Sequence, residues 1–216
     1  MVERQIARRG IADPLVLEAM RTVPREPFVP EHLGAEAYAD RALPIDEGQT
    51  ISQPYVVALM AEALELSPSD RVLEVGVGSG YAAAILGHIA REVVGIERHE
   101  ALARAARDRL RAQGHANVRV VVGDGTLGWP TEAPFDAILV SAGGPEVPRA
   151  LLDQLVDGGR LVIPVGEPGA VQDLLKIVRE GDGRYREESL GKVQFVPLIG
   201  DQGWQDGPAS SERMDG

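Results

Sequence analysis

The chain has 216 residues, of which 44% are hydrophobic and 25% charged, with a formal net charge of −11 and no cysteine. This composition is typical of one globular domain, and it excludes disordered, collagen-like and coiled-coil proteins. The missing cysteine excludes thiolate nucleophiles, iron–sulfur clusters and cysteine-based zinc sites, and the negative charge argues against a nucleic-acid partner because a phosphate backbone would repel it.

The first 66 residues are predicted to form a helical arm and a segment on the substrate side. Asp13-Pro14 is typical of a helix start, and apolar residues follow it at helical spacing (Leu15, Val16, Ala19, Met20 and Val23). Residues 23–30 contain three prolines, so an extended segment is expected there. A second helix is expected from Pro54 to about Leu66.

From Arg71 onward, predicted strands alternate with predicted helices. Strands are expected at residues 71–75, 92–96, 117–122, 135–141, 160–165, 172–179 and 193–198, and helices at 81–90, 101–113 and 148–155. Gly181-Asp182-Gly183 is the predicted turn of a terminal hairpin. The alternation predicts an α/β fold over residues 67–204, a doubly wound and mostly parallel sheet of seven strands, and the polar residues 205–216 are expected to be a disordered tail.

Three motifs at the predicted strand ends indicate a nucleoside-containing cofactor. Gly76, Gly78 and Gly80 form a G-x-G-x-G turn that opens a helix, where glycine permits close approach of a ligand. This spacing matches neither the dinucleotide fingerprint nor the phosphate-binding loop. Glu97 ends the second strand, where a carboxylate can accept both hydrogen bonds of a ribose diol. Gly123-Asp124-Gly125 ends the third strand, where such a turn can hold an adenine edge.

Together these motifs resemble the S-adenosylmethionine-dependent class I methyltransferases, whose fold this chain is then expected to share. That cofactor has no pyrophosphate, which would explain the shifted third glycine. The alternative is an ordinary glycine turn of an α/β protein that binds no cofactor. For Glu74, in the first strand, two interpretations stay open: it orients the methionine amino group of the cofactor, or it stabilises the turn.

The sequence after the fourth strand limits which chemical groups the chain could methylate. The residues there read Ser141-Ala142-Gly143-Gly144-Pro145, without the Asn/Asp-Pro-Pro-Tyr/Phe motif of enzymes that methylate exocyclic or amide nitrogens. The missing cysteine excludes methylation of a pyrimidine ring carbon through a covalent cysteine intermediate. A carboxylate or an alkoxide remains as the acceptor. A carboxylate with a pKa of about 4 is already ionised at neutral pH, so its methylation needs alignment and desolvation and no general base.

Ser52 lies just before the second helix, whose first residue is expected to be Pro54. Free amides at the helix start could hold an anionic acceptor, with the Ser52 hydroxyl as an added donor. The alternative is that Ser52 merely caps the helix.

Residues 2–204 resemble the protein-L-isoaspartate (D-aspartate) O-methyltransferase family. The stretches that carry the resemblance are Arg9-Gly10-Ile11, Val23-Pro24-Arg25-Glu26-Pro27-Phe28-Val29-Pro30, Gly48-Gln49-Thr50-Ile51-Ser52-Gln53-Pro54-Tyr55, Gly123-Asp124-Gly125, Gly128-Trp129-Pro130, Ala133-Pro134-Phe135-Asp136-Ala137-Ile138 and Phe195-Val196-Pro197-Leu198.

The resemblance implies methyl transfer from S-adenosyl-L-methionine to the α-carboxylate of isoaspartyl residues in damaged proteins and peptides. Ser52 matches the active-site serine of the family. Cofactor contacts are implied for Thr50, Ile51, Glu74, Gly76, Gly78, Gly80, Glu97, Asp124 and Gly125. Substrate contacts are implied for Ser52, Val196, Pro197 and Leu198.

The chain departs from the family pattern at four places: Val57, Val77, Ala82 and Gly143-Gly144. These departures bear on cofactor affinity more than on activity. Three alternatives remain: a carboxyl methyltransferase with one dedicated biosynthetic substrate, a cofactor-binding protein without turnover, and, less favoured, a nicotinamide dehydrogenase.

The sequence also predicts where the protein acts. No apolar run approaches the roughly 20 residues of a membrane span, and the first residues lead into no apolar signal segment. The four histidines lack metal-ligand spacing. We therefore expect a cytoplasmic monomer without a metal site, and without a membrane or nucleic-acid partner.

Overall fold

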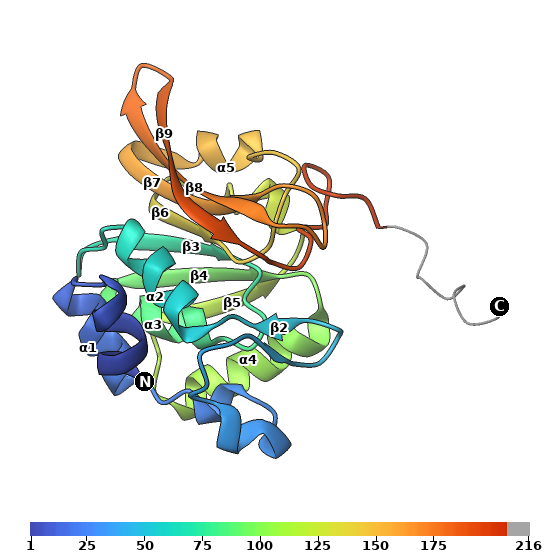
Figure 1. Cartoon of the computed structure of the whole chain (residues 1–216). Helices are drawn as coiled ribbons and strands as arrows, with labels where there is room; N and C mark the ends of the chain where they lie inside the picture. Colours follow the sequence, from blue (N-terminus) through green and yellow to red (C-terminus); the bar gives the residue numbers. More distant parts are fainter. Residues whose placement is uncertain (207–216) are drawn as a thin grey trace.

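A computed structural model describes residues 1–206 and shows a sheet of seven strands in the order β5-β4-β3-β6-β7-β8-β9 (Figure 1). The strands are β3 (Arg71–Val75), β4 (Glu92–Glu97), β5 (Val118–Val122), β6 (Phe135–Val140), β7 (Leu155–Val165), β8 (Gln172–Gly181) and β9 (Arg184–Val193). The first five strands in this order, β5-β4-β3-β6-β7, pair in parallel. Strand β8 pairs antiparallel with both β7 and β9. The predicted α/β class and the mostly parallel seven-stranded sheet are confirmed.

Helices cover both faces of this sheet. They are α1 (Pro14–Thr22), α2 (Pro54–Ala63), α3 (Tyr81–Ile89), α4 (Glu100–Ala112) and α5 (Arg149–Asp153). Figure 1 shows α1 to α4 on one side of the sheet and α5 on the other. Alternating residues of the strands supply both cores: Val72 packs with the residues of α1 to α4, and Leu73 with Leu151 of α5.

The N-terminal arm packs on the same core as the sheet. The Asp13 carboxylate caps α1, accepting hydrogen bonds from the amides of Leu15 and Val16, and the buried side chains of Met20 and Phe28 join the cluster that contains Val72. Short helical turns precede and follow α1: η1 (Val2–Ile6), η2 (Ala7–Arg9), η3 (Glu26–Phe28) and η4 (Glu31–Glu36). A small antiparallel ribbon, β1 (Leu43–Pro44) and β2 (Thr50–Ile51), leads into α2.

The prediction of a last strand at residues 193–198 is wrong. The Gly181-Asp182-Gly183 turn is where predicted, with positive φ at all three residues, but the strand that follows it is β9 (Arg184–Val193). Seven of the ten residues of β9 are charged residues, serine or glycine. This edge strand is largely exposed, so it lacks the apolar pattern of a buried strand. Residues 194–198 form a loop in which Pro197 makes one isolated bridge to Gly143.

Smaller differences concern the ends of elements. The segment 23–30 is not extended throughout, because Pro27 lies inside the short η3 turn, where its missing amide costs no helical hydrogen bond. Helix α2 ends at Ala63, since Glu65 takes a positive φ. Helix α5 ends at Asp153, and β7 begins at Leu155, inside the predicted helix.

The predictions about the tail and about membrane spans can be compared with the structure only over residues 1–206. Gln205 and Asp206 have defined positions, and Asp206 pairs with Arg98, so the start of the predicted tail is ordered; residues 207–216 lie outside the described part. Within residues 1–206, none of the helices combines the length and apolar character that crossing a bilayer requires.

Candidate functional site

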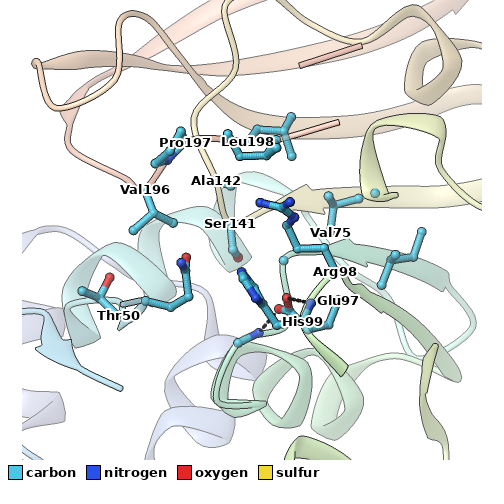
Figure 2. Close-up of a pocket in the computed structure, with 16 residues that line it drawn as sticks. Thr50, Val75, Glu97, Arg98, His99, Ser141, Ala142, Val196, Pro197 and Leu198 are labelled. Atoms are coloured by element: carbon cyan, nitrogen blue, oxygen red, sulfur yellow. Dashed lines mark hydrogen bonds between the residues drawn. The ribbon is translucent and has the colours of Figure 1, made fainter. Parts of the chain in front are cut away.

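A cleft of ≈ 200 Å³ opens at the carboxyl ends of β3, β4 and β6. The chain runs from β3 outward to β5 and then returns to β6 on the other side of β3, so this is the switch point of the sheet, where α/β proteins bind ligands. The cleft is lined by Gln49, Thr50, Val75, Gly76, Gly78, Ile96, Glu97, Arg98, His99, Gly125, Ser141, Ala142, Val196, Pro197, Leu198 and Ile199. Figure 2 shows Val196, Pro197 and Leu198 on one side of it and Glu97 and His99 on the opposite side.

The glycine loop after β3 forms one wall of the cleft. Gly76, Gly78 and Gly80 all have positive φ (83°, 53° and 93°), which side chains other than glycine rarely adopt. Gly76 and Gly78 line the cleft, whereas Gly80 does not and instead starts α3, where a Cβ would contact Ala106. Val77, one of the departures from the family pattern, packs over Gly95, whose missing side chain leaves room for it.

Glu97 has the position and the free acceptor sites that a ribose diol requires. Its side chain is 5% exposed; one oxygen accepts a hydrogen bond from the Gly78 amide (2.8 Å) and the other from the His99 amide (2.9 Å). Figure 2 marks both bonds. Because each carboxylate oxygen has two lone pairs, one on each remains for a ligand. The two amides therefore orient the carboxylate before a ligand arrives.

Glu74 is a fully buried carboxyl group without a protein partner. Its side chain lies on the same face of the sheet as Glu97, and neither of its oxygens has a hydrogen bond among the described residues. Burial, and then the nearby Glu97 charge, raises its pKa well above the usual value. It lines a small cavity next to the cleft, together with Ser52, Gly76 and Val57.

These facts bear on the two interpretations of Glu74. Stabilisation of the turn is not supported, because no hydrogen bond joins the carboxyl group to the glycine loop. A buried acceptor without a donor fits an ammonium group supplied by a ligand, since that cation would restore the missing interactions. The methionine end of S-adenosyl-L-methionine carries such a group. The residues present therefore fit this cofactor.

Removal of the Glu74 charge should change how stability depends on pH. A carboxyl group whose pKa is raised in the folded state holds its proton longer there than in the unfolded chain, so the wild type loses stability as pH rises from the unfolded to the folded pKa. We expect the melting temperature of Glu74→Gln to rise relative to that of wild type as the pH increases above the usual carboxyl range, because only the wild type must hold a proton or bury a charge there. Thermal melts without cofactor measure this. Glu92→Gln is the control, because Glu92 is the first residue of β4, at the amino end of the strands. Parallel curves of melting temperature against pH for Glu74→Gln and wild type would contradict a raised pKa for Glu74.

Asp124 and Gly125 follow β5, but only Gly125 lines the cleft. The Asp124 carboxylate accepts hydrogen bonds from the amide and the hydroxyl of Thr126 and from the amide of Asp201. It thereby ties the β5 loop to the C-terminal segment, and it lines a separate depression beside the cleft. A Cβ on Gly125 would lie 2.3 Å from a methyl group of Val75, so this glycine allows the loop to close on β3.

Ser52 lies between β2 and α2 and does not cap the helix. Residue Gln53 occupies the N-cap position, and no side chain caps the helix amides there. The Ser52 side chain instead lines both the Glu74 cavity and an outer groove. Thr50 lines the cleft, the Glu74 cavity and the groove, so it marks the junction of the three. Ile51 is buried and pairs with Leu43, which holds the ribbon in place.

The loop with Val196, Pro197 and Leu198 is held over the cleft by Gly143. The Gly143 amide donates to the Val196 carbonyl, and the Gly143 carbonyl accepts from the Leu198 amide, both at 2.8 Å. A Cβ on Gly143 would lie 2.2 Å from the buried Gln172 amide, which itself bonds the backbone of Phe195. The glycine at this departure from the family pattern is therefore matched to Gln172, which occupies the space that a side chain would need.

The structure adds residues that the sequence analysis did not select. Arg98, His99 and Ser141 line the cleft. Their signal was position: Ser141 is the last residue of the predicted fourth strand, and Arg98 and His99 closely follow the predicted second strand. Arg25 is fully buried and donates to the Ser52 carbonyl at 2.7 Å and to the Ala37 carbonyl at 2.8 Å. Nothing in the local sequence marks Arg25, since an arginine is exposed by default.

Comparison with known proteins gives one consistent family. The family model described as Protein-L-isoaspartate(D-aspartate) O-methyltransferase matches residues 1–203. Protein-L-isoaspartate O-methyltransferase 2 of Pelobacter propionicus is 60% identical over 204 residues, 94% of this chain and 91% of the relative. The protein-L-isoaspartate O-methyltransferase of Methylorubrum populi is 60% identical over 199 residues, 92% of this chain and 93% of the relative.

Solved structures agree with the sequence comparisons. A protein-L-isoaspartate O-methyltransferase superposes with a TM-score of 0.82 at 29% identity, over 94% of this chain and 67% of the other. A beta-aspartate methyltransferase from Plasmodium falciparum, in complex with S-adenosyl-L-homocysteine, superposes with a TM-score of 0.76 at 28% identity, over 89% of this chain and 94% of the other.

Proposed function

Because the chain belongs to the protein-L-isoaspartate(D-aspartate) O-methyltransferase family, we propose that it transfers a methyl group from S-adenosyl-L-methionine to the α-carboxylate of L-isoaspartyl and D-aspartyl residues in damaged proteins and peptides. The observation that carries the proposal is the position of Ser52 and Thr50. The Ser52 hydroxyl, which caps no helix, lies at a cavity that adjoins the Glu97 cleft. Thr50 lines both the cavity and the cleft.

Cofactor binding is assigned to the cleft and the cavity beside it. Glu97 would accept the hydrogen bonds of the ribose diol, and the Glu74 carboxylate would pair with the methionine ammonium group. The remaining cofactor-binding roles are assigned to Thr50, Ile51, Gly76, Gly78, Gly80, Asp124 and Gly125. Gly80 and Asp124 act indirectly, because they shape the loops around the cleft. When bound, S-adenosyl-L-methionine supplies an electrophilic methyl group.

The substrate side needs to align a carboxylate that is already ionised. Ser52 would donate its hydroxyl hydrogen to one oxygen of the substrate carboxylate and thereby aim the other at the methyl group. Val196, Pro197 and Leu198 present mainly apolar surface, which excludes water and raises the reactivity of the carboxylate. None of the chain's residues has to remove a proton from the acceptor, because a carboxylate ionises far below neutral pH.

Methylation makes repair possible because the carbonyl carbon of a methyl ester can lose methanol, whereas a carboxylate has no comparable leaving group. The neighbouring backbone amide nitrogen attacks the ester carbonyl, expels methanol and closes a succinimide. Hydrolysis of the succinimide then converts a fraction of the damaged residues back to normal aspartate.

The decisive test is transfer of labelled methyl from S-adenosyl-L-methionine to paired peptides that differ only in isoaspartate against aspartate. We expect base-labile label on the isoaspartyl peptide alone. Ser52→Ala should lower kcat/KM about tenfold to hundredfold, the value of one hydrogen bond to a charged group, with unchanged affinity for S-adenosyl-L-homocysteine. Ser69→Ala, an exposed serine at the opposite end of β3, is the matched control. Cofactor binding without label on either peptide would contradict the proposal and favour a dedicated substrate or a binding protein without turnover.

The wider setting is part of the same proposal. Residues 1–66 form the N-terminal arm and the substrate-side segment with Ser52, and residues 67–204 form the α/β domain that binds the cofactor. The two act as one unit, which is supported by their shared apolar core. We expect a cytoplasmic monomer without nucleic-acid or membrane partners, in keeping with its net charge of −11.

A further inference from the structure

An open groove of ≈ 480 Å³ adjoins the cofactor cleft at Thr50 and the Glu74 cavity at Thr50 and Ser52. One wall comes from the ribbon and the start of α2. The other comes from the residue before β8 and from the end of β9 with the two residues that follow it. Its lining is Ala42, Thr50, Ser52, Gln53, Val56, Val171, Lys192, Val193, Gln194 and Phe195. Figure 1 shows the end of β9 reaching toward the segment between β2 and α2. Its volume is within the range of ligand sites.

The chemistry of the groove combines apolar surface with one cation. Val171 is 67% exposed, more than any other large hydrophobic side chain among residues 1–206, and Val56 lies on the opposite wall. Lys192 is one of the two lysines of the chain and the one that is exposed; Lys176 is buried against Glu65. In a protein of net charge −11, this places a positive group where an acidic ligand would otherwise be repelled.

Lys192 already pairs with Asp173 at 2.7 Å, but that pair is weak. The side chains are 62% and 42% exposed, and exposed pairs contribute only about 0–1 kcal/mol. Lys192 can therefore exchange Asp173 for a carboxylate of a ligand at little cost. The groove shares Ser52 and Thr50 with the site assigned to the isoaspartyl residue, so a bound peptide would continue into it.

We propose that this groove binds the substrate residues that flank the isoaspartyl residue on one side, and that it selects an apolar side chain next to Val171 and an acidic one next to Lys192. The inference rests on the proposed function and adds to it the sequence context in which damage is recognised. Lys192 and Val171 are specificity-determining residues in it and take no part in methyl transfer.

The experiment compares isoaspartyl peptides that carry Glu or Lys at the flanking positions, with wild type, Lys192→Glu and Arg184→Glu. Arg184 lies at the far end of β9, so its variant makes the same charge change away from the groove. For Lys192→Glu we expect KM to rise about threefold to tenfold on Glu peptides and to fall on Lys peptides, with kcat unchanged. Peptide binding measured by fluorescence anisotropy with S-adenosyl-L-homocysteine present should shift equally, and added salt should reduce the difference.

Two further arms make the outcomes distinct. Truncation of the peptide on one side of isoaspartate should abolish the effect of Lys192→Glu, and Val171→Ser should weaken binding of peptides with an apolar neighbour only. Equal behaviour of Lys192→Glu and Arg184→Glu, on isoaspartyl peptides that are still methylated, would overturn the groove assignment and leave the proposed function intact. Failure of wild type to bind or methylate any isoaspartyl peptide would overturn both.

Discussion

Glu97→Ala is expected to weaken binding of S-adenosyl-L-homocysteine about 100-fold or more. The reason is the number of charge-assisted hydrogen bonds that end on this carboxylate. Two ribose hydroxyl groups would donate to it, each worth about 1.5–3 kcal/mol, and about 1.4 kcal/mol corresponds to a tenfold change in affinity. The variant also leaves the amides of Gly78 and His99 without their acceptor, so the glycine loop loses its orientation.

Isothermal titration with S-adenosyl-L-homocysteine measures the loss. Glu92→Ala is the matched control: Glu92 starts the same strand, and its carboxylate pairs with Arg71 at 3.1 Å, away from the cleft. A ligand that lacks the ribose 2′-hydroxyl group separates the direct contact from a change in the loop, because wild type should lose affinity for it while Glu97→Ala should not. Binding by Glu97→Ala within about threefold of wild type would refute the ribose assignment.

Arg25→Ala is expected to lower the free energy of unfolding by about 3–5 kcal/mol. Its guanidinium group is fully buried, donates to the carbonyl oxygens of Ala37 and Ser52, and lies 4.8 Å from the centre of the Tyr81 ring. Burial lowers its pKa to about 10, so the group is still charged at neutral pH. Truncation therefore leaves a cavity and removes the donor from the buried Ala37 carbonyl and from the part-buried Ser52 carbonyl.

Urea unfolding measures the stability change. Arg21→Ala is the matched control, because Arg21 pairs with Glu3 on the surface and should contribute less than about 1 kcal/mol. Arg25→Lys keeps the charge but offers no planar fork for two acceptors, so it should lie between wild type and Arg25→Ala. Since the Ser52 carbonyl is one of the two acceptors, both variants should also raise KM for isoaspartyl peptide more than they change cofactor affinity. A loss below about 1 kcal/mol for Arg25→Ala would show that the buried contacts are not needed.

The cleft assigned to the cofactor could be predicted from the sequence because its lining depends on local patterns. Alternating apolar strands and helices predicted a parallel sheet, and the carboxyl ends of parallel strands meet at one edge. Gly76, Glu97 and Gly125 were each placed at a strand end, so their meeting followed from the topology alone. The glycines of the loop needed no tertiary information either, since their spacing indicated the turn.

The remaining features depended on contacts between distant segments. The polar sequence of β9 does not indicate a strand, because an edge strand is specified by its pairing with β8 and not by burial of its own side chains. Gly143 reads as an unusual glycine until Gln172 is seen to fill the space of its Cβ.

Arg25 and the outer groove make the same point for function. The burial of Arg25 is decided by carbonyl groups 12 and 27 residues further along the chain, and the groove joins the start of α2 to the end of β9. The sequence by itself indicated the fold class and the sheet edge assigned to the cofactor, because periodicity and motif spacing are local properties of the chain. The family followed from the resemblance of whole stretches of sequence. Only the tertiary structure decided what holds Ser52 and what surface surrounds it, because a side chain's burial and partners exist only once distant segments have packed together.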